Sequence, residues 1–359
     1  MGAILKQKKP ERRRRDILLK SEQPRSTAAE AADCSGLHRR TDMGLYRAAL
    51  PQLAGDVFLT DGGIETTLIF HDGLDLPFFA AFDLLRRENG REALQRYYRG
   101  HAVIAAEHGV GFILESATWR ASADWGEKLG YSRPELAEAN RAAVRMLEEI
   151  RDEYAMNTTR MVISGCVGPR GDGYDPACLM SEGEAQRYHA EQVDVFTTTA
   201  ADMVTAITMT NIPEAIGVTR AAQAAGMPVV ISFTVETDGR LPTGDSLKAA
   251  MERVDAATGA GPAYYMINCA HPTHFDGALS SREPWIRRLR GLRANASTKS
   301  HAELDEAKEL DDGNPVEFGA QYRTLMDRLP HLAVLGGCCG TDQRHIAAIA
   351  SACVRRRAA

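Results

Sequence analysis

A rhythm of short apolar runs and longer amphipathic segments, repeated eight times from residue 55 onward, most constrains the fold of this chain. The apolar runs are nearly continuous, which is typical of parallel strands that are buried on both faces. Eight such units in roughly 300 residues match the size of one (β/α)8 TIM-type barrel. The alternative is a doubly wound open sheet. No G-x-G-x-x-G follows the first run, which disfavours the dinucleotide-binding version of that fold.

The apolar runs predict eight strands, and the segments between them predict the barrel helices. The seventh run is the weakest, and residues 289–297 are its best candidate. Ser181 and Glu184 have the spacing of a helix-capping box. The expected strands are 56–63, 110–116, 160–169, 202–209, 228–236, 263–271, 289–297 and 332–340, and the expected helices are 91–109, 134–155, 181–200, 212–226, 246–259, 316–330 and 342–357.

Two segments differ from this rhythm. Residues 1–45 are polar and basic without apolar periodicity, which predicts a disordered basic tail before a single barrel domain at 46–359. Met43 is an alternative start of the chain. Residues 298–315 are densely charged, which predicts either a solvated helix or loop or a lid over the barrel mouth.

Composition narrows the class of protein. The chain has 359 residues, of which 44% are hydrophobic and 25% charged, and its formal net charge is −5. This mild acidity favours no nucleic-acid partner, and no apolar run reaches the roughly 18 residues of a membrane span. Seven cysteines, an odd number in a large chain without an export signal, indicate free or metal-bound thiols in a reducing, cytoplasmic environment.

In a TIM-type barrel the active-site residues come from the carboxyl ends of the strands. The expected strands end in Asp61, Glu115, Cys166 and Cys269 and in the adjacent pair Cys338 and Cys339. Strands six and eight are close neighbours, so the last three thiols are expected to converge. Three thiolates with an open fourth position suit a catalytic Zn²⁺ ion.

Other interpretations of these residues remain open at this point. Cys269 with His271 and His274 forms a C-x-H-x-x-H pattern, the basis of a zinc lyase or hydrolase. The pair Cys338 and Cys339 could instead form a vicinal disulfide or simply pack in the core. Cys166 is interpreted as a thiol that lines the rim without binding metal.

Three motifs, LTDGGIETTL, MINCAHP and GGCCGTD, make residues 55–353 resemble the homocysteine S-methyltransferase family. The resemblance implies a (β/α)8 barrel with Zn²⁺ held by Cys269, Cys338 and Cys339. It also implies a small-molecule thiol acceptor, homocysteine, which receives a methyl group from an onium donor such as S-methylmethionine, S-adenosylmethionine or betaine to give methionine. Asp61, Gly62 and Gly63 match the family's DGG element at the substrate mouth.

The chain departs from the family at strand four, where Ile207 occupies the position of a glutamate that binds the acceptor's amino group. Our hypothesis is that Glu115 takes over this charge, with Asp61 beside it. Alternatively, Glu115 pairs with Arg120 or another base, and the acceptor is a different thiol or the chain is a non-catalytic thiol- or metal-binding descendant.

Aromatic and acidic residues near the rim provide candidates for binding a cationic donor. Trp119 and Trp125 are the expected aromatic wall, through cation–π attraction. Glu236 and Asp238, which follow the fifth run, are candidate electrostatic partners of the same donor.

Overall fold

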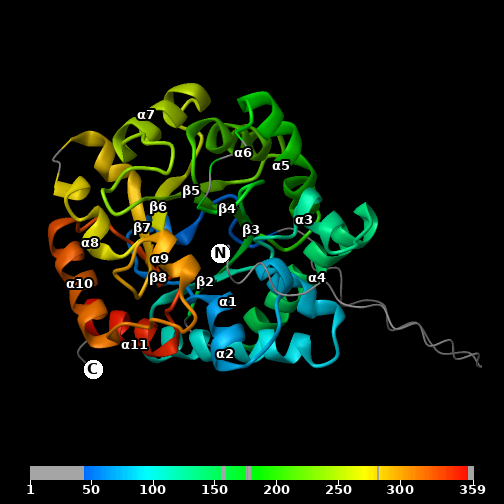
Figure 1. Cartoon of the computed structure of the whole chain (residues 1–359), viewed down its shortest axis with the longest axis horizontal. Coiled ribbons are helices and arrows are strands. Elements are labelled where there is room, and N and C mark those ends of the chain that lie inside the picture. Colours follow the sequence, from blue (N-terminus) through cyan, green and yellow to red (C-terminus); the bar gives the residue numbers. More distant parts are fainter. Residues whose placement is uncertain (1–43, 155–158, 175, 177–178, 281–282, 355–359) are drawn as a thin grey trace, which may run out of the picture.

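Eight parallel strands form a closed barrel in the order β1 to β8, which confirms the TIM-barrel prediction (Figure 1). This computed structural model describes residues 44–154, 159–174, 176, 179–280 and 283–354. The weak seventh run does form a strand. The strands are β1 Phe58–Leu59, β2 Gly111–Glu115, β3 Met161–Val167, β4 Met203–Met209, β5 Val229–Thr234, β6 Tyr264–Asn268, β7 Leu289–Ala294 and β8 Val334–Gly337.

Helices surround the barrel, as Figure 1 shows, and each expected helix is present. The capping box at Ser181 is confirmed at the start of α5. The α-helices are α1 Ile64–Thr66, α2 Gly90–Glu107, α3 Ala123–Lys128, α4 Arg133–Glu153, α5 Glu182–Thr197, α6 Ile212–Ala224, α7 Leu247–Thr258, α8 Pro272–Phe275, α9 His301–Glu306, α10 Pro315–Arg328 and α11 Gln343–Cys353. Shorter turns are η1 Pro51–Ala54, the π-helical η2 Thr67–His71, η3 Pro77–Phe79, η4 Ala81–Arg86, η5 Ala278–Ser280 and η6 Pro284–Arg288.

The interior of the barrel changes from apolar to polar along the strands. Side chains alternate between the two faces of a strand, so every second residue points inward. Near the amino ends of the strands these residues form an apolar cluster: Phe58, Ile113, Val162, Met203, Val230, Tyr264, Met266 and Val334. Two residues further along the strands, the inward positions include Glu115, Ser164, Thr205 and Arg293. The packed layer is therefore the floor of a polar chamber at the carboxyl ends.

The segment that precedes β1 closes the amino end of the barrel. The backbone N–H of Tyr46 donates to Asp202 Oδ1 at 2.6 Å, and the Arg47 guanidinium donates to the carbonyl of Ala201 at 2.8 Å. Asp202 is fully buried and also accepts from the backbone of Ile163 at 2.8 Å. The carboxyl end is thus the open mouth.

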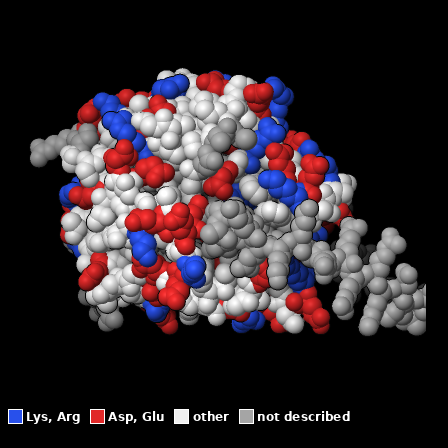
Figure 2. Space-filling view, in the orientation of Figure 1, with Lys and Arg blue, Asp and Glu red and all other residues white. Residues whose placement is uncertain are grey.

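Residues 1–43, which include Met43 and most of the expected basic tail, lie outside the described residues, as does Cys178. Within the described part of the chain, no helix is both long and apolar enough to span a membrane. Figure 2 shows acidic and basic side chains interspersed over the visible face.

Candidate active site

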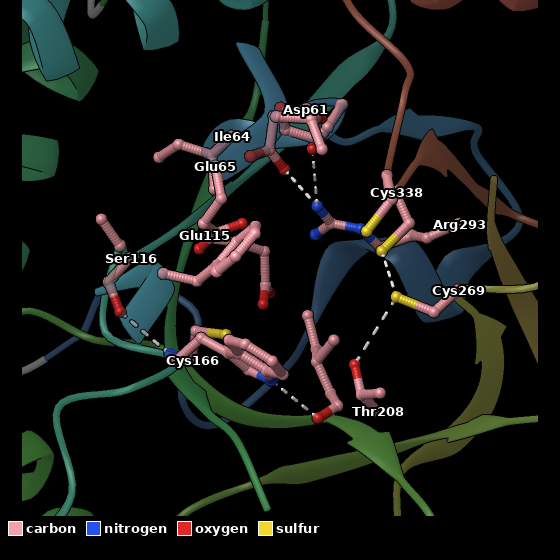
Figure 3. A pocket seen from close by; sticks show the side chains of 18 of the residues that line it. Asp61, Ile64, Glu65, Glu115, Ser116, Cys166, Thr208, Cys269, Arg293 and Cys338 are labelled. Carbon is pink, nitrogen blue, oxygen red and sulfur yellow. Dashed lines mark hydrogen bonds and ion pairs between the residues drawn. The ribbon is translucent and has the colours of Figure 1, made fainter. Parts of the chain in front are cut away.

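Three thiols meet at the barrel mouth, as the strand ends suggested. Cys269 directly follows β6, and Cys338 and Cys339 directly follow β8. Their three Sγ atoms lie within 4.8 Å of one another, and the sulfurs of Cys269 and Cys338 are 2.6 Å apart (Figure 3). All three are free cysteines. Of the residues that the structure describes, they form the single group of metal-ligand side chains large enough to hold an ion.

The backbone around the thiols is tightly constrained. Cys269 has a φ of 54°, in the left-handed region that a non-glycine residue rarely adopts, and Gly340 has a φ of 79°. Such strain persists where the surrounding structure fixes it, often at functional sites. Asn268 supplies part of that support, because its side-chain oxygen accepts from Ser232 at 2.6 Å and its amide donates to Thr208 at 2.8 Å.

Hydrogen bonding among the thiols polarises them. The pKa of Cys338 lies well below its usual value, chiefly because the thiols of Cys269 and Cys339 donate to its sulfur, with a further contribution from the positive charge of Arg293. The hydroxyl of Tyr174 lies 3.5 Å from Cys339 Sγ, and its ring stacks on His301 at 3.9 Å between centroids. The cluster thus favours an anionic sulfur.

A pocket opens beside the thiols and is lined by the residues expected to bind the acceptor. Asp61, Gly62, Gly63, Glu115 and Trp119 all line it together with the three cysteines. Ile207, which we matched from the sequence to the family's glutamate, also lines the pocket with an apolar side chain.

A buried cation that the sequence reasoning missed organises the pocket charges. Arg293, at the inward position of β7, donates from Nη2 to Asp61 Oδ1 at 2.7 Å. The other oxygen of Asp61 accepts from the Tyr97 hydroxyl at 3.0 Å. The available signal was a basic residue at the expected end of a strand, the same place that indicated the other site residues. Both oxygens of Asp61 are therefore already held by protein groups.

Glu115 lies on the barrel wall below the thiols. Its Oε1 accepts from the hydroxyl of Thr205 at 2.9 Å. Burial raises the pKa of Glu115, and the positive charge of Arg293 offsets part of that rise. Arg293 is therefore the basic residue that most affects the pKa of Glu115. Arg120, which we considered as a partner of Glu115, is not among the main causes of that pKa shift.

Glu65 is a second pocket carboxylate that the sequence reasoning passed over, although it lies inside the quoted DGGIETTL motif. Burial raises its pKa to about 7, and the charges of Cys338 and Asp61 act in the same direction. Because Glu65 lines the pocket, it is a charge that titrates near neutral pH beside the thiols.

The paired glycines after β1 allow their turn to pack closely against the turn that follows β8. A Cβ at Gly62 would lie 2.7 Å from the carbonyl oxygen of Thr341, and one at Gly63 would lie 2.5 Å from that of Cys338. The N–H of Gly63 donates to the carbonyl of Thr341 at 2.9 Å, so it is already used within the protein. The glycines allow the β1–α1 turn to pack against the turn that carries the thiols.

The two tryptophans are arranged around an arginine. The guanidinium of Arg120 lies 4.0 Å from the ring of Trp119 and 3.9 Å from that of Trp125, and Lys128 lies 3.9 Å from Trp125. Trp119 lines the pocket and donates from Nε1 to the carbonyl of Ile207 at 3.2 Å. Trp125 is not among the pocket residues, so of the expected aromatic wall only Trp119 faces the cavity.

The histidine-based zinc alternative is wrong for the described residues. His271 Nδ1 pairs with the hydroxyl of Thr273 at 2.8 Å and caps α8, and His274 Nε2 bonds the carbonyl of Thr298 at 2.9 Å. Neither joins Cys269 in a group of metal ligands. Cys166 lines the pocket but is likewise outside the thiol group.

A second, adjoining compartment begins beside Cys339. It shares Thr66, Phe79, Tyr174 and Cys339 with the first pocket. Its other walls combine one aromatic, three acidic and several apolar or small residues, and they come largely from the charged segment 298–315: Phe70, Ser297, Leu304, Asp305, Ala307, Glu309, Leu310, Asp311 and Gly340. That segment therefore forms a wall at the barrel mouth. Neither acid expected after β5 lines the two compartments: Glu236 bonds His301 Nδ1 at 3.0 Å, and Asp238 accepts from the backbone N–H of Arg240 at 3.0 Å.

Known proteins resemble this chain over most of its length. Residues 58–353 match the family model described as homocysteine S-methyltransferase. Homocysteine S-methyltransferase 4 of Zea mays is 24% identical over 323 residues, covering 83% of this chain and 90% of the maize protein. The selenocysteine Se-methyltransferase of Brassica oleracea var. italica is 24% identical over 329 residues, covering 84% of this chain and 90% of that protein.

Two solved structures share the fold. The oxidised form of the homocysteine methyltransferase MmuM from Escherichia coli aligns with a TM-score of 0.66 at 19% identity, covering 84% of this chain and 99% of that one. Its metallated form aligns with a TM-score of 0.65 at 18% identity, covering 82% of this chain and 96% of that one.

Proposed function

We propose that this chain, which belongs to the homocysteine S-methyltransferase family, transfers a methyl group from a cationic onium donor to the sulfur of a small thiol, most simply homocysteine, with the help of Zn²⁺. The observation that carries the proposal is the group of three free thiols that line a pocket at the barrel mouth. The names of the relatives, which act on homocysteine or selenocysteine, support a sulfur or selenium acceptor.

The donor set fits zinc. Cys269, Cys338 and Cys339 supply three soft sulfur ligands within 4.8 Å of one another, and no other side chain of the described part of the chain joins them as a ligand. When bound, Zn²⁺ would lower the pKa of an acceptor thiol so that it reacts as a thiolate. The neighbouring metallated structure supports the capacity of this fold to hold a metal.

The residues of the pocket then bind and orient the reactants. We assign the acceptor's amino group to Glu115, with the charge of Asp61 close by and Gly62 and Gly63 shaping the wall. The thiolate forms a new S–CH₃ bond, the donor's bond to the methyl breaks, the leaving group departs neutral, and the thiol proton is released to solvent. Alignment of donor and acceptor accounts for much of such a rate enhancement.

The adjoining compartment suits the donor. Phe70 and Phe79 line it with aromatic rings, and Asp305 and Glu309 line it with carboxylates, a combination that attracts sulfonium or quaternary ammonium groups. A third carboxylate, Asp311, pairs with Lys299 at 3.4 Å. Trp119 lines the first pocket and extends the aromatic surface. S-methylmethionine, S-adenosylmethionine and betaine share this cationic character, so the donor panel must include all three.

The test combines metal content with methyl transfer. Purified protein should contain about one zinc per chain and methylate homocysteine from at least one of the three donors. Cys338→Ser should lose both properties, whereas Cys353→Ser, a buried thiol on α11 outside the group, should keep them. Zinc binding without transfer from any donor would instead favour a thiol- or metal-binding descendant, and absence of zinc would overturn the proposal.

A further inference from the structure

Each of the three thiol sulfurs has a polar neighbour outside the thiol group that can donate a hydrogen bond to it. A thiol that binds a metal is deprotonated, so in each pair the neighbouring group must be the donor. The pairs are the Thr208 hydroxyl with Cys269 at 3.8 Å, the Asn268 amide with Cys338 at 3.9 Å and the Tyr174 hydroxyl with Cys339 at 3.5 Å. The thiols thus have the surroundings of metal-bound thiolates.

Tyr174 reaches the thiols from the loop after β3. Its ring stacks on the ring of His301, with 3.9 Å between centroids and 15° between planes. A phenol keeps its hydrogen at neutral pH, so its hydroxyl can donate to the sulfur of Cys339. The stacked histidine therefore holds a hydrogen-bond donor beside one thiol.

The same histidine supports the backbone of a second thiol. His301 Nε2 lies 2.6 Å from the carbonyl oxygen of Cys269, and since a carbonyl only accepts, Nε2 is the donor. Cys269 is the thiol whose φ of 54° lies in the left-handed region, a conformation that persists only where the surroundings fix it. On the other side of the ring, Nδ1 pairs with Glu236 at 3.0 Å, which fixes the orientation of the ring. His301 itself is only 6% exposed.

The charged segment 298–315 is what brings this histidine to the site. His301 is the first residue of α9, and the capping box of Ser300 and Glu303 fixes where that helix begins. The segment forms the wall of the adjoining compartment and also contacts one of the three thiol residues directly. Its role therefore extends beyond that of a solvated loop.

We propose that Tyr174 and His301 are positioning residues of the metal site: Tyr174 donates a hydrogen bond to the thiolate of Cys339, and His301, oriented by Glu236, holds Cys269 where its sulfur can bind the metal. This inference rests on the proposed function, because it requires a metal on the three thiols. Groups that hydrogen-bond metal ligands orient them and tune the electron density they give to the metal.

Tyr174→Phe tests the hydrogen bond to sulfur, because it keeps the stacked ring and removes only the hydroxyl. Zinc affinity is measured by competition with a chelator, and the chain refilled with Co²⁺ gives a sulfur-to-metal charge-transfer band. Loss of the hydrogen bond leaves more electron density on the Cys339 sulfur, so the band should move to longer wavelength, and zinc affinity should fall by about 10-fold. Tyr265→Phe, which removes a hydroxyl that bonds Asp255 at 2.7 Å, should change neither.

His301→Phe tests the support of Cys269, because it keeps a ring for stacking and removes both nitrogens. Zinc affinity should fall by about 10- to 100-fold. His301→Gln, whose side-chain amide can donate in place of Nε2, should recover most of the affinity, and Glu236→Ala should lie between the two. His331→Phe is the matched control: its Nε2 also bonds a backbone carbonyl, that of Ile286 at 2.8 Å, but near the amino end of β8, so zinc affinity should be unchanged.

The inference and the proposed function can fail separately, because neither measurement requires methyl transfer. Unchanged zinc affinity in His301→Phe together with an unchanged cobalt band in Tyr174→Phe, in a chain that binds zinc and transfers methyl groups, would overturn only the inference. Equal losses of affinity in His301→Phe and His301→Gln would show a packing role and also overturn it. The expected changes in both variants, in a chain that no donor enables to methylate a thiol, would support the inference and overturn only methyl transfer.

Discussion

At the scale of single residues, the pocket brings several charged side chains together in a largely buried site. Asp61, Glu65, Glu115 and Arg293 all line one cavity, and burial dominates the pKa shifts of both glutamates. Such shifted groups cluster at functional sites because ligand binding and catalysis need them, often at a cost in stability.

Glu65 should show this cost as a dependence of stability on pH. Its pKa is about 7 in the folded protein and near 4.5 when unperturbed, so the folded state loses stability as the pH rises from about 4.5 to about 7. Glu65→Gln mimics the protonated form and should therefore be more stable than wild type by about 1–2 kcal/mol at pH 8. Urea denaturation at pH 8 and at pH 4.5 measures the difference, which should vanish at the lower pH. A gain of equal size at both values would contradict this explanation.

At the scale of elements, the site depends on two turns that pack against each other. The β1–α1 turn with Gly62 and Gly63 contacts the turn after β8 that carries Cys338 and Cys339. Gly340 N–H also donates to Thr66 Oγ1 at 3.1 Å, which ties the second turn to α1. The position of the thiols is therefore set by backbone packing between the first and last strands.

Gly63→Ala should disturb this packing. Its Cβ would lie 2.5 Å from both the carbonyl oxygen of Cys338 and the hydroxyl of Thr66, so the backbone must shift. We expect a loss of about 1–3 kcal/mol in unfolding free energy and a lower zinc affinity, measured by denaturation and by competition with a chelator. Gly183→Ala in α5 is the control, because its nearest atom is a flexible arginine end at 3.5 Å, and it should be neutral or slightly stabilising. Normal zinc affinity in Gly63→Ala would show that the contact is not needed.

At the scale of the whole molecule, function and stability are separated between the two ends of the barrel. The mouth holds the thiols and the pocket, whereas the closed end holds a buried polar network centred on Asp202. That residue accepts from the N–H groups of Tyr46 and Ile163 and pairs with Arg151.

Asp202→Ala should therefore destabilise the barrel without altering the site. Its removal leaves Arg151 buried without its charge partner, which costs about 3–5 kcal/mol in unfolding free energy. Asp56→Ala, which removes an exposed ion pair with Arg160, should cost at most about 1 kcal/mol. Chemical denaturation measures both, and zinc content per folded chain should be unchanged in each. Loss of zinc in folded Asp202→Ala would contradict the separation of the two ends.

The sequence by itself determined the barrel, the family and the three thiols. Eight buried runs that alternate with helices match a closed barrel, the missing G-x-G-x-x-G disfavours an open dinucleotide-binding sheet, and the rule that active sites form at strand ends applies without coordinates. The same rule indicated Asp61 and Glu115, because a carboxylate that ends an apolar run is conspicuous. Even the weak seventh run followed from the count of eight.

Only the tertiary structure decided how these groups pair. Arg293 neutralises Asp61 across 232 positions of sequence, and nothing local to either residue indicates the contact. His271 and His274 have a metal-like spacing, yet the fold directs them to Thr273 and Thr298. Spacing fixes which residues lie on one element, but the pairing of charges depends on barrel closure, which brings the inward faces of β1, β2 and β7 around one cavity.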